Sequence, residues 1–328
     1  MKCAVIKKFG KEIENIAIEE RDDLRASGEN IRVKVSATAL NRADLLQRRG
    51  LYPAPAGVPQ DIPGLEFVGK IDQIGENVTL WKCGERVFGI VGGGSYAEQL
   101  IIHQQMAVRV PDELSDIEAA SIPEAFITAH DALVTQMGIK PGELVLIHAV
   151  AGGVGSAVVQ LVKLYGAEAI GTASSAEKLL KIAEIANFFP VNYKKENFKD
   201  VIEKRFGGNC VDLVFDTIGA SYLKQNIDLL KNCGRLVLVG LLGGIVCQID
   251  LSVILNKRLR IKGTVLRSRS PDEKISAIQA FAKDVLPYFR SRKLRPVIDS
   301  VFSFENLHEA TLRMEKNENI GKIILTLP

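Results

Sequence analysis

The sequence predicts an α/β protein with a doubly wound parallel sheet in the middle of the chain. Three observations lead to this expectation. A short apolar run that suits a strand, Leu144–Ile147, meets a glycine-rich turn, and an apolar segment of helical character follows. Strand-like and helix-like segments then alternate as far as Leu266, which is typical of a parallel sheet with helices on both faces. Before about Ser115 the pattern is different, because short β-like runs are separated by glycines.

The pattern of residues 1–123 predicts a small, mostly antiparallel and barrel-like domain. The β-patterned runs are 31–35, 67–71, 86–90 and 97–102, with glycines at 64, 69, 75, 84, 89 and 92–94 as punctuation. The last part of the chain, 267–328, contains an expected helix at 271–291 and two strand-like pieces at 297–302 and 322–325. We expect these short strands to return to the first domain.

The alternation of strand-like and helix-like segments in residues 124–266 predicts a nucleotide-binding domain. Helical periodicity runs through 117–133, and further helices are expected at 156–165, 176–185 and 222–230. The strand candidates are 144–147, 169–172, 189–192, 213–216, 236–240 and 259–266. Six strands in alternation with helices suit a doubly wound sheet.

The glycine-rich turn has the chemistry of a dinucleotide pyrophosphate site. Gly152, Gly153 and Gly155 let the backbone approach phosphates, and the free N–H groups of the following helix point at the negative charge. Ala149 stands where the usual G-x-G-x-x-G has its first glycine. A purely structural turn is the alternative, but the strand before the turn and the strands after it favour a dinucleotide site.

The end of the second strand indicates which dinucleotide binds. An NAD site has an acidic residue there to bond the ribose 2′-hydroxyl. Here the strand ends in Ser174 and Ser175, with Lys178 one helical turn later and Tyr193 closing the third strand. Hydroxyls and a cation suit a 2′-phosphate, so the sequence predicts NADPH, although Lys178 alone could belong to a solvated helix face.

Composition excludes several classes of protein. The formal charge of +3 over 328 residues, without a Lys/Arg block, gives no support for nucleic-acid binding. No apolar run is long enough for a membrane span, and charges interrupt the N-terminus too early for a signal peptide, so a cytoplasmic location is expected. The five cysteines show no C-x-x-C pair, which excludes a four-cysteine zinc site, and we expect them to be small buried hydrophobic residues.

Several motifs, in order along the chain, carry a family resemblance. They are Asn41-Arg-Ala-Asp44 with Arg48, Gly50 and Tyr52, Pro63-Gly-Leu-Glu66 with Gly69, Thr128-Ala-His-Asp-Ala-Leu133, the glycine turn, Ser174 with Lys178, Asn192-Tyr193-Lys194, Asp216-x-Ile-Gly219, Gly234-Arg-Leu with Val239-Gly240, and Gly321-Lys-Ile-Ile-Leu325. With these motifs the chain resembles the zinc-free quinone oxidoreductases of the medium-chain dehydrogenase/reductase superfamily, especially the zeta-crystallin-like and p53-inducible quinone reductase groups. The resemblance covers essentially the whole chain. It implies a GroES-like catalytic domain at 1–123, a Rossmann NADPH-binding domain at 124–266 and a C-terminal return to the catalytic domain at 267–328.

The resemblance also assigns site residues. Tyr52, Asn41, Asp44 and Thr128 are expected around the substrate, in a cleft between the domains. The expected cofactor-binding residues are Ala151, Gly152, Gly153, Val154, Gly155, Ser174, Lys178, Tyr193, Gly219, Gly240, Leu266 and Asn319. Zinc-bearing relatives place metal ligands at the positions that match Asn41 and Leu65. Neither side chain can replace a thiolate or an imidazole, so no metal is expected.

The predicted reaction is hydride transfer from NADPH to a small quinone, with a proton from solvent or a nearby hydroxyl. One alternative is reduction of the double bond of an enone or enoyl thioester, because reductases of that kind also carry a Gly-x-Tyr like Gly50-Leu-Tyr52. A second alternative is a non-catalytic, crystallin-like NADPH-binding protein. A homodimer is expected through the edge strand at 259–266, in which apolar and basic residues alternate.

Overall fold

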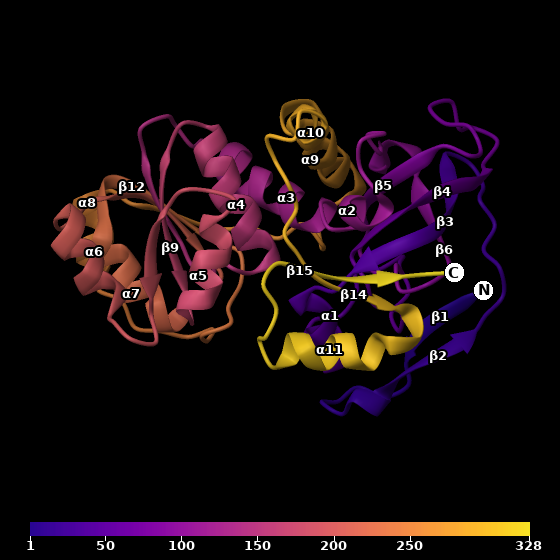
Figure 1. The fold of residues 1–328 in the computed structure, drawn as a ribbon, viewed down its shortest axis with the longest axis horizontal. Helices are drawn as coiled ribbons and strands as arrows, with labels where there is room; N and C mark the ends of the chain where they lie inside the picture. Colours follow the sequence, from indigo (N-terminus) through magenta and orange to yellow (C-terminus); the bar gives the residue numbers. More distant parts are fainter. The chain divides into compact units, whose positions relative to one another are not determined.

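The computed structural model describes residues 1–328, which form two compact units. One unit combines residues 1–127 with 266–328, and the other contains residues 128–265 (Figure 1). None of the helices combines the length and the apolar character that crossing a membrane requires.

The first unit is built on a mainly antiparallel sheet. Its strands are β3 (Asn30–Ala39), β4 (Glu66–Ile74), β5 (Arg86–Ile90), β6 (Gln99–His103), β7 (Val108–Arg109), β14 (Ile298–Ser303) and β15 (Lys322–Thr326), and a separate pair is β1 (Lys2–Ile6) with β2 (Ile16–Glu20). The order is β14-β15-β3-β4-β5-β7, with β6 paired to β3. Only β14 and β15 are parallel, so the end of the chain adds two strands beside β3.

Alternation along β3 shows how this sheet forms its core. Ile31, Val33 and Val35 are fully buried, whereas Arg32 between them pairs with Asp72 of β4 at 2.8 Å. Successive side chains of a strand point to opposite faces, so the apolar set shares one face. Phe67, Ile71 and Tyr96 join the same core.

Short helices lie between the strands of this unit. They are α1 (Arg42–Arg48), α2 (Asp116–Ala120), α9 (Pro271–Asp284), α10 (Leu286–Arg290), α11 (Leu307–Glu315) and the 3-10 turns at Ile13–Asn15, Gln104–Met106 and Phe304–Asn306. The single helix expected at 271–291 was wrong, because the chain breaks at Val285, which caps both α9 and α10. Pro287 follows the break, and a proline ring clashes with the carbonyl four residues earlier in a continuous helix.

The second unit is a doubly wound parallel sheet. Its elements are β8 (Leu144–Ile147), α4 (Gly153–Leu164), β9 (Glu168–Ala173), α5 (Ala176–Ala183), β10 (Phe189–Asn192), α6 (Phe198–Phe206), β11 (Val211–Asp216), α7 (Ala220–Leu229), β12 (Leu230–Leu238), α8 (Leu251–Lys257) and β13 (Arg260–Gly263). The strands lie in the order β10-β9-β8-β11-β12-β13 and are all parallel. Successive strands of the chain are added on one side of β8 up to β10, and on its other side from β11 onwards. Helices α4 and α5 lie on one side of the sheet, and α6, α7 and α8 on the other (Figure 1). The predicted fold class is confirmed.

The two edge strands explain two features of the sequence. Pro190 lies in β10, where an edge strand can do without one ladder donor. The other edge, β13, is four residues long and is shorter than the expected strand at 259–266. Its outer side has no partner strand within the chain.

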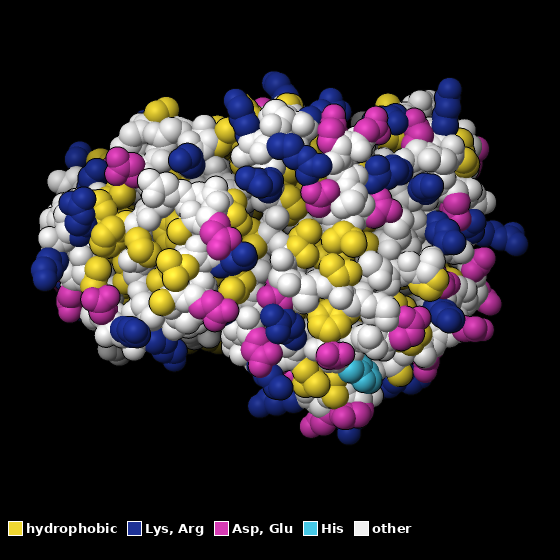
Figure 2. Space-filling view, viewed as in Figure 1, with side chains coloured by type: hydrophobic (Ala, Val, Ile, Leu, Met, Phe, Trp, Pro, Cys, Tyr) yellow, Lys and Arg dark blue, Asp and Glu magenta, His cyan; other side chains and the backbone are white.

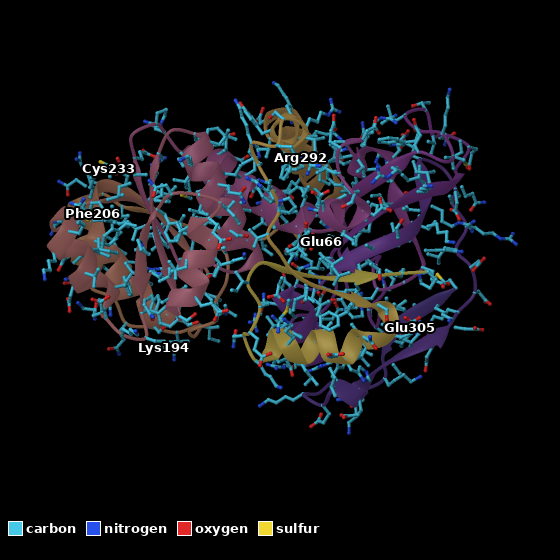
Figure 3. All side chains as sticks on the ribbon, viewed as in Figure 1. Glu66, Lys194, Phe206, Cys233, Arg292 and Glu305 are labelled. Atoms are coloured by element: carbon cyan, nitrogen blue, oxygen red, sulfur yellow. The ribbon has the colours of Figure 1, made fainter.

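The cysteines differ from the expectation that all are buried. Cys3 and Cys210 are buried, but Cys83, Cys233 and Cys247 are exposed. Cys233 lies at the outer end of this unit (Figure 3), in an irregular part of β12 where its φ is +62°.

The helix α3 (Pro123–His130) begins in the first unit and ends in the second. Its last turn continues as a π-helical segment, Asp131–Gln136. Asp131 accepts a hydrogen bond from the Thr264 hydroxyl at 3.1 Å, within the second unit.

Candidate active site

A buried cluster of polar side chains lies where three strands of the first unit meet. Asn41 follows β3 and caps α1, Glu66 begins β4, and Lys322 begins β15. Because β3 lies between β4 and β15 in the sheet, residues from distant parts of the sequence meet at one end of β3. Figure 3 shows Glu66 among the interior side chains of this unit.

Glu66 and Lys322 form a buried ion pair with a complete set of hydrogen bonds. The Lys322 Nζ lies 2.6 Å from Glu66 Oε1, and their side chains are 5% and 0% exposed. Nζ also donates to Asn41 Oδ1 at 2.7 Å and to the carbonyl of Leu40 at 3.0 Å. Asn41 Nδ2 donates to Glu66 Oε1 at 2.9 Å, and the backbone N–H of Glu124 donates to Glu66 Oε2 at 2.9 Å. These hydrogen bonds offset the free-energy cost of removing the two charges from water.

Asp44 lies beside this pair and accepts from different donors. It is 5% exposed and receives hydrogen bonds from the backbone N–H of Asn41 at 2.7 Å, the N–H of Gly64 at 3.0 Å and the hydroxyl of Tyr96 at 2.9 Å. Burial raises the pKa of Asp44 to about 6, although these donors act in the opposite direction. Burial, followed by the Asp44 charge, raises the pKa of Tyr96 well above 10.

Gly64 has no room for a side chain. Its φ is +99°, and a Cβ there would lie 2.3 Å from Ser95 Oγ and 2.8 Å from the backbone N of Tyr96. The close approach brings the Gly64 N–H within reach of Asp44. This explains the glycine of Pro63-Gly-Leu-Glu66 without reference to a metal.

Tyr52 is held by an arginine that the sequence analysis did not single out. The Arg267 guanidinium lies 4.8 Å from the centre of the Tyr52 ring and donates to the Tyr52 carbonyl at 3.0 Å. It also donates to the carbonyl of Gly92 at 2.7 Å and to Gln47 Oε1. Burial raises the pKa of the half-buried Tyr52 phenol, and the Arg267 charge partly offsets this rise.

Glu124 is a further carboxyl group at this cluster. It lies in the first turn of α3 and is partly exposed. Burial, and next the negative charge of Glu66, raise its pKa to about 8. Thr128, a predicted site residue, lies one helical turn later on α3 and belongs to the second unit.

The glycine turn of the second unit has the geometry that a phosphate cradle needs. Gly152 caps α4, which begins at Gly153, so the N–H groups of its first turn have no helical partner. A Cβ on Gly155 would lie 2.2 Å from the Ala149 carbonyl, so only glycine lets the helix approach the turn this closely. Ala149 has a φ of +53°, where the usual motif places glycine. Ala151 is buried and Val154 is partly exposed in the same turn.

The carboxyl ends of β9 and β10 bring three predicted cofactor residues together. Asn192 pairs with Ala173, and the N–H of Tyr193 donates to the Ala173 carbonyl at 3.2 Å. Ser174 follows Ala173 directly, and Lys178 lies in the first turn of α5. Ser175, not Ser174, caps this helix through its hydroxyl, which leaves the Ser174 hydroxyl outside the cap.

Other predicted cofactor residues lie at the ends of neighbouring strands or in the first unit. Gly219 follows β11, and Gly240 follows β12 with a Cβ position 3.0 Å from the Thr217 carbonyl. Leu266 and Asn319 belong to the first unit, where Leu266 is buried and Asn319 donates to the Gly321 carbonyl at 2.8 Å.

A buried network beneath the second unit's strand ends was missed by the sequence analysis. His148 contacts Asn226 at 2.7 Å and Thr172 at 3.0 Å, and Asn226 donates to Asp216 at 3.1 Å. Asp216 also accepts from the N–H groups of Ile218 and Gly219 at 2.7 and 3.0 Å. Burial lowers the pKa of His148, so this residue is a neutral part of the scaffold.

The residues missed by sequence analysis had one visible signal. Glu66, Lys322 and Arg267 each adjoin an apolar strand-like run, where a charge needs a partner. The partner itself could not be read from the sequence. No group of three or more His, Cys, Asp or Glu side chains is arranged to hold a metal ion, and Leu65 is buried at its position.

The fold and the site define a class of oxidoreductase. Residues 27–112 match the alcohol dehydrogenase GroES-like domain, and residues 153–283 match the family described as zinc-binding dehydrogenase. Both belong to the medium-chain dehydrogenase/reductase superfamily, and the chain is therefore an oxidoreductase of that superfamily.

Curated relatives define the branch. The chain is 30% identical over 298 residues to the quinone oxidoreductase-like protein 2 homolog of Nematostella vectensis, covering 90% of this chain and 81% of the relative. It is 30% identical over 304 residues to the quinone oxidoreductase of Homo sapiens, covering 90% and 88%. The chain belongs to the quinone oxidoreductase-like family, whose cofactor is a nicotinamide dinucleotide.

Solved structures share the whole fold. A quinone oxidoreductase of Pseudomonas syringae is 26% identical with a TM-score of 0.88, over 99% of each chain. The CurK enoyl reductase is also 26% identical, with a TM-score of 0.85 over 100% of this chain and 99% of its own. The same fold therefore serves both quinone and enoyl reductases.

Proposed function

We propose that the protein reduces a small quinone with NADPH and without a metal ion. The observation that carries the choice of NADPH is the end of β9, where Ser174, Lys178 and Tyr193 gather and no carboxylate stands in the position that would bind a 2′-hydroxyl. Quinone oxidoreductases occur both among the relatives by sequence and among the solved structures of the same fold, and this supports a quinone as the substrate.

The residues of the second unit fit a dinucleotide. The α4 N-terminus, with its free N–H groups and Gly155, suits the pyrophosphate, and Ser174 with Lys178 suits a 2′-phosphate. When bound, NADPH supplies the hydride. The role of the protein is then to hold a flat acceptor and to manage a proton.

The residues of the first unit suit the acceptor. Asn41 and Asp44 are held in one orientation by the ion pair and by backbone donors. Tyr52 has its ring fixed under Arg267, and its hydroxyl can donate to a quinone oxygen. Asn41 and Leu65 at the former ligand positions favour chemistry without a Lewis acid.

The second candidate is reduction of a carbon–carbon double bond in an enone or an enoyl thioester. The resemblance to CurK enoyl reductase, which has the same 26% identity to this chain as the quinone oxidoreductase, favours this candidate. Gly50-Leu-Tyr52 is compatible with either substrate. A non-catalytic NADPH-binding role is the third possibility, and turnover of any acceptor would exclude it.

Stopped-flow oxidation of NADPH tests the proposal. Quinones, enones and enoyl thioesters of similar size are mixed with the protein, before and after prolonged treatment with a chelator. We expect the fastest reduction with quinones and no change after chelation. A higher kcat/KM for an enone or thioester would favour the second candidate, and zinc-dependent recovery after chelation would contradict the metal-free mechanism.

A homodimer through β13 is part of the same proposal. Large apolar side chains in the segment between β12 and β13 are exposed, among them Leu242 at 58%, Ile245 at 80%, Val246 at 83% and Leu255 at 75%. Figure 2 shows hydrophobic side chains gathered on the visible face of the unit that carries α4 to α8. A second copy that pairs its own β13 would cover the edge.

Sedimentation velocity at micromolar concentration measures the oligomeric state. We expect a dimer that Ile261→Pro converts to a monomer, because proline removes a donor from the paired edge. A wild-type monomer would contradict this part of the proposal. The cytoplasmic location stays a prediction from the sequence.

A further inference from the structure

The loop that carries Tyr52 has no helix or strand of its own. Residues 52–60 are mostly exposed, and three of the nine are prolines, which have no N–H to donate to a neighbouring strand. The Gln60 side chain closes the loop on itself, because its Nε2 donates to the carbonyls of Pro55 and Val58 at 2.9 and 3.0 Å. Contacts with the rest of the first unit therefore decide how this loop is placed.

Arg267 supplies contacts to two sides of this loop. It is 5% exposed, its Nη1 donates to the Tyr52 carbonyl at 3.0 Å, and its Cζ lies 4.8 Å from the centre of the Tyr52 ring. Its Nε donates to the Gly92 carbonyl at 2.7 Å. A Cβ on Gly92 would lie 3.4 Å from Pro55 and from Val58, so Gly92 packs against the same loop. One planar side chain thus holds the loop at Tyr52 and the segment on which the loop rests.

Gln47 of α1 connects Arg267 to the other end of the loop. Its side chain is fully buried, its Oε1 accepts from Arg267 Nη2, and its Nε2 donates to the Gln60 carbonyl at 3.0 Å. Arg267 contacts the loop directly at Tyr52 and, through Gln47, at Gln60. Both ends of the loop are therefore attached to one buried guanidinium group.

The charge of Arg267 has no counter-ion within ion-pair distance. The two other buried arginines of the chain, Arg48 and Arg235, each pair with a glutamate, at 2.6 and 2.5 Å. Arg267 instead donates to three neutral oxygen atoms, and the carboxyl groups that act on it do so from beyond ion-pair distance. The face of the Tyr52 ring attracts the guanidinium, and this attraction fixes the ring as well as the arginine.

We propose that Arg267 is a positioning residue for the acceptor and acts through Tyr52. This inference rests on the proposed function, in which the Tyr52 hydroxyl bonds to the acceptor. Together with Gln47, Arg267 keeps Tyr52 and the loop in the conformation that binds, so little binding free energy is used to order them. The rigid guanidinium fork donates to all three oxygen atoms at once, which a lysine ammonium on its flexible stem cannot reproduce.

Steady-state kinetics of Arg267→Lys measures the effect of the guanidinium fork, because the variant keeps the positive charge. We expect KM for a quinone to rise about tenfold, since the ring and the hydroxyl of Tyr52 both lose their fixed position, and kcat to stay within about threefold. The matched control is Arg109→Lys. Arg109 is an exposed arginine of the same unit that lies 5.4 Å from the centre of the Trp81 ring. Its replacement should leave KM within about twofold of wild type.

A double variant shows whether Arg267 acts through Tyr52. Tyr52→Leu removes the ring, so adding Arg267→Lys to that variant should raise KM by less than about twofold. A merely structural effect of the arginine would instead multiply with the effect of Tyr52→Leu. A further tenfold rise in the double variant, or a KM within about twofold of wild type in Arg267→Lys alone, would overturn the inference.

Amide hydrogen exchange measured by mass spectrometry needs no substrate. Peptides that span residues 50–62 should exchange faster in Arg267→Lys and in Gln47→Met than in wild type, while peptides from β3 keep the wild-type rate. Gln47→Met breaks the links to Arg267 and Gln60 but leaves the arginine in place, so it decides the matter if Arg267→Lys does not fold. Unchanged exchange of 50–62 in the folded variants would overturn the inference. Failure of every acceptor would instead contradict the proposed function, and the exchange rates would still show whether Arg267 and Gln47 hold the loop.

Discussion

Each unit buries a carboxylate at the ends of its strands, but the two units stabilise that carboxylate with different partners. In the second unit Asp216 is bonded to Asn226, to His148 through that amide, and to two backbone N–H groups, without a cation. In the first unit Glu66 is paired with Lys322, and two more carboxyl groups lie nearby. The network around Asp216 contains no cation, its members are hydrogen-bonded to one another, and it suits a scaffold. The charged cluster also contains the Glu124 carboxyl, whose pKa burial, and next the negative charge of Glu66, raise to about 8.

The largest expected effect comes from removing the cation. Lys322→Met should lower the free energy of unfolding by about 3–5 kcal/mol at pH 7, because Glu66 is left as an unpaired buried charge. Denaturant unfolding followed by circular dichroism measures this. The double variant Glu66→Leu with Lys322→Met should recover most of the loss. A loss below about 1 kcal/mol in the single variant would mean that the ion pair is not isolated from water.

The next effect is a pH dependence of stability. The folded state keeps the Glu124 proton up to about pH 8, whereas the unfolded chain releases it near 4.5. The folded state therefore binds more protons in this window, and the free energy of unfolding should fall as pH rises. Asp44, with its pKa of about 6, adds a fall of the same sign at lower pH.

Comparison of Glu124→Gln with wild type between pH 6 and 8 isolates Glu124, because the fall that Asp44 contributes near pH 6 is common to both. The Glu124 slope is at most about 1.4 kcal/mol per pH unit, and about 2 kcal/mol over this window once partial exposure is allowed for. Glu124→Gln should lack this part of the fall, and Glu113→Gln, which changes an exposed loop carboxylate of the same unit, should keep it. An equal slope in both variants would show that another group is responsible.

Cofactor discrimination tests the second unit alone. Lys178→Ala should weaken NADPH binding by about 1.5–3 kcal/mol, because a charge-assisted contact to the 2′-phosphate is lost. NADH binding should stay unchanged, and this serves as the internal control. Fluorescence titration of both nucleotides measures the difference. Equal affinity of the wild type for NADPH and NADH would contradict the assignment of Ser174 and Lys178.

The network around Asp216 should contribute to stability and not to the pH dependence of turnover. Asn226→Leu removes the donor to Asp216 and the partner of His148, which should lower the free energy of unfolding by about 1–3 kcal/mol. The pH profile of kcat should keep its shape. Thermal unfolding and steady-state kinetics at several pH values check both statements. A shifted pH profile would make this network part of the chemistry.

The smallest effect is expected at Tyr52. If Tyr52 only orients a quinone, Tyr52→Phe loses one hydrogen bond, about 0.5–1.5 kcal/mol, or a few-fold in kcat/KM. If it donates a proton to carbon, the loss should approach roughly 10²–10⁴-fold. Steady-state kinetics with one quinone and one enone measure this. A loss beyond a hundredfold, together with a preference for the enone, would overturn the quinone proposal.

The fold of the second unit could be predicted from the sequence because the signals that indicate it are local. The glycine turn, the strands on either side and the missing acid after β9 are close together in the chain, and each has a local physical cause such as Gly155 beneath the Ala149 carbonyl. The family motifs likewise indicated Asn41, Asp44 and Tyr52. The sequence by itself thus determined the fold class and the family, whereas the NADPH site at Ser174 and Lys178 stays a prediction.

Only the tertiary structure showed how the charges of the first unit are balanced. Glu66 and Lys322 are far apart in the sequence and meet because β15 pairs with β3, which pairs with β4. Arg267 meets Tyr52 for a similar non-local reason. A carboxyl group in a sequence shows neither its burial nor its donors, and those decide its pKa. The raised pKa of Glu124 therefore arises from the packing of the folded chain, and no local sequence pattern encodes it.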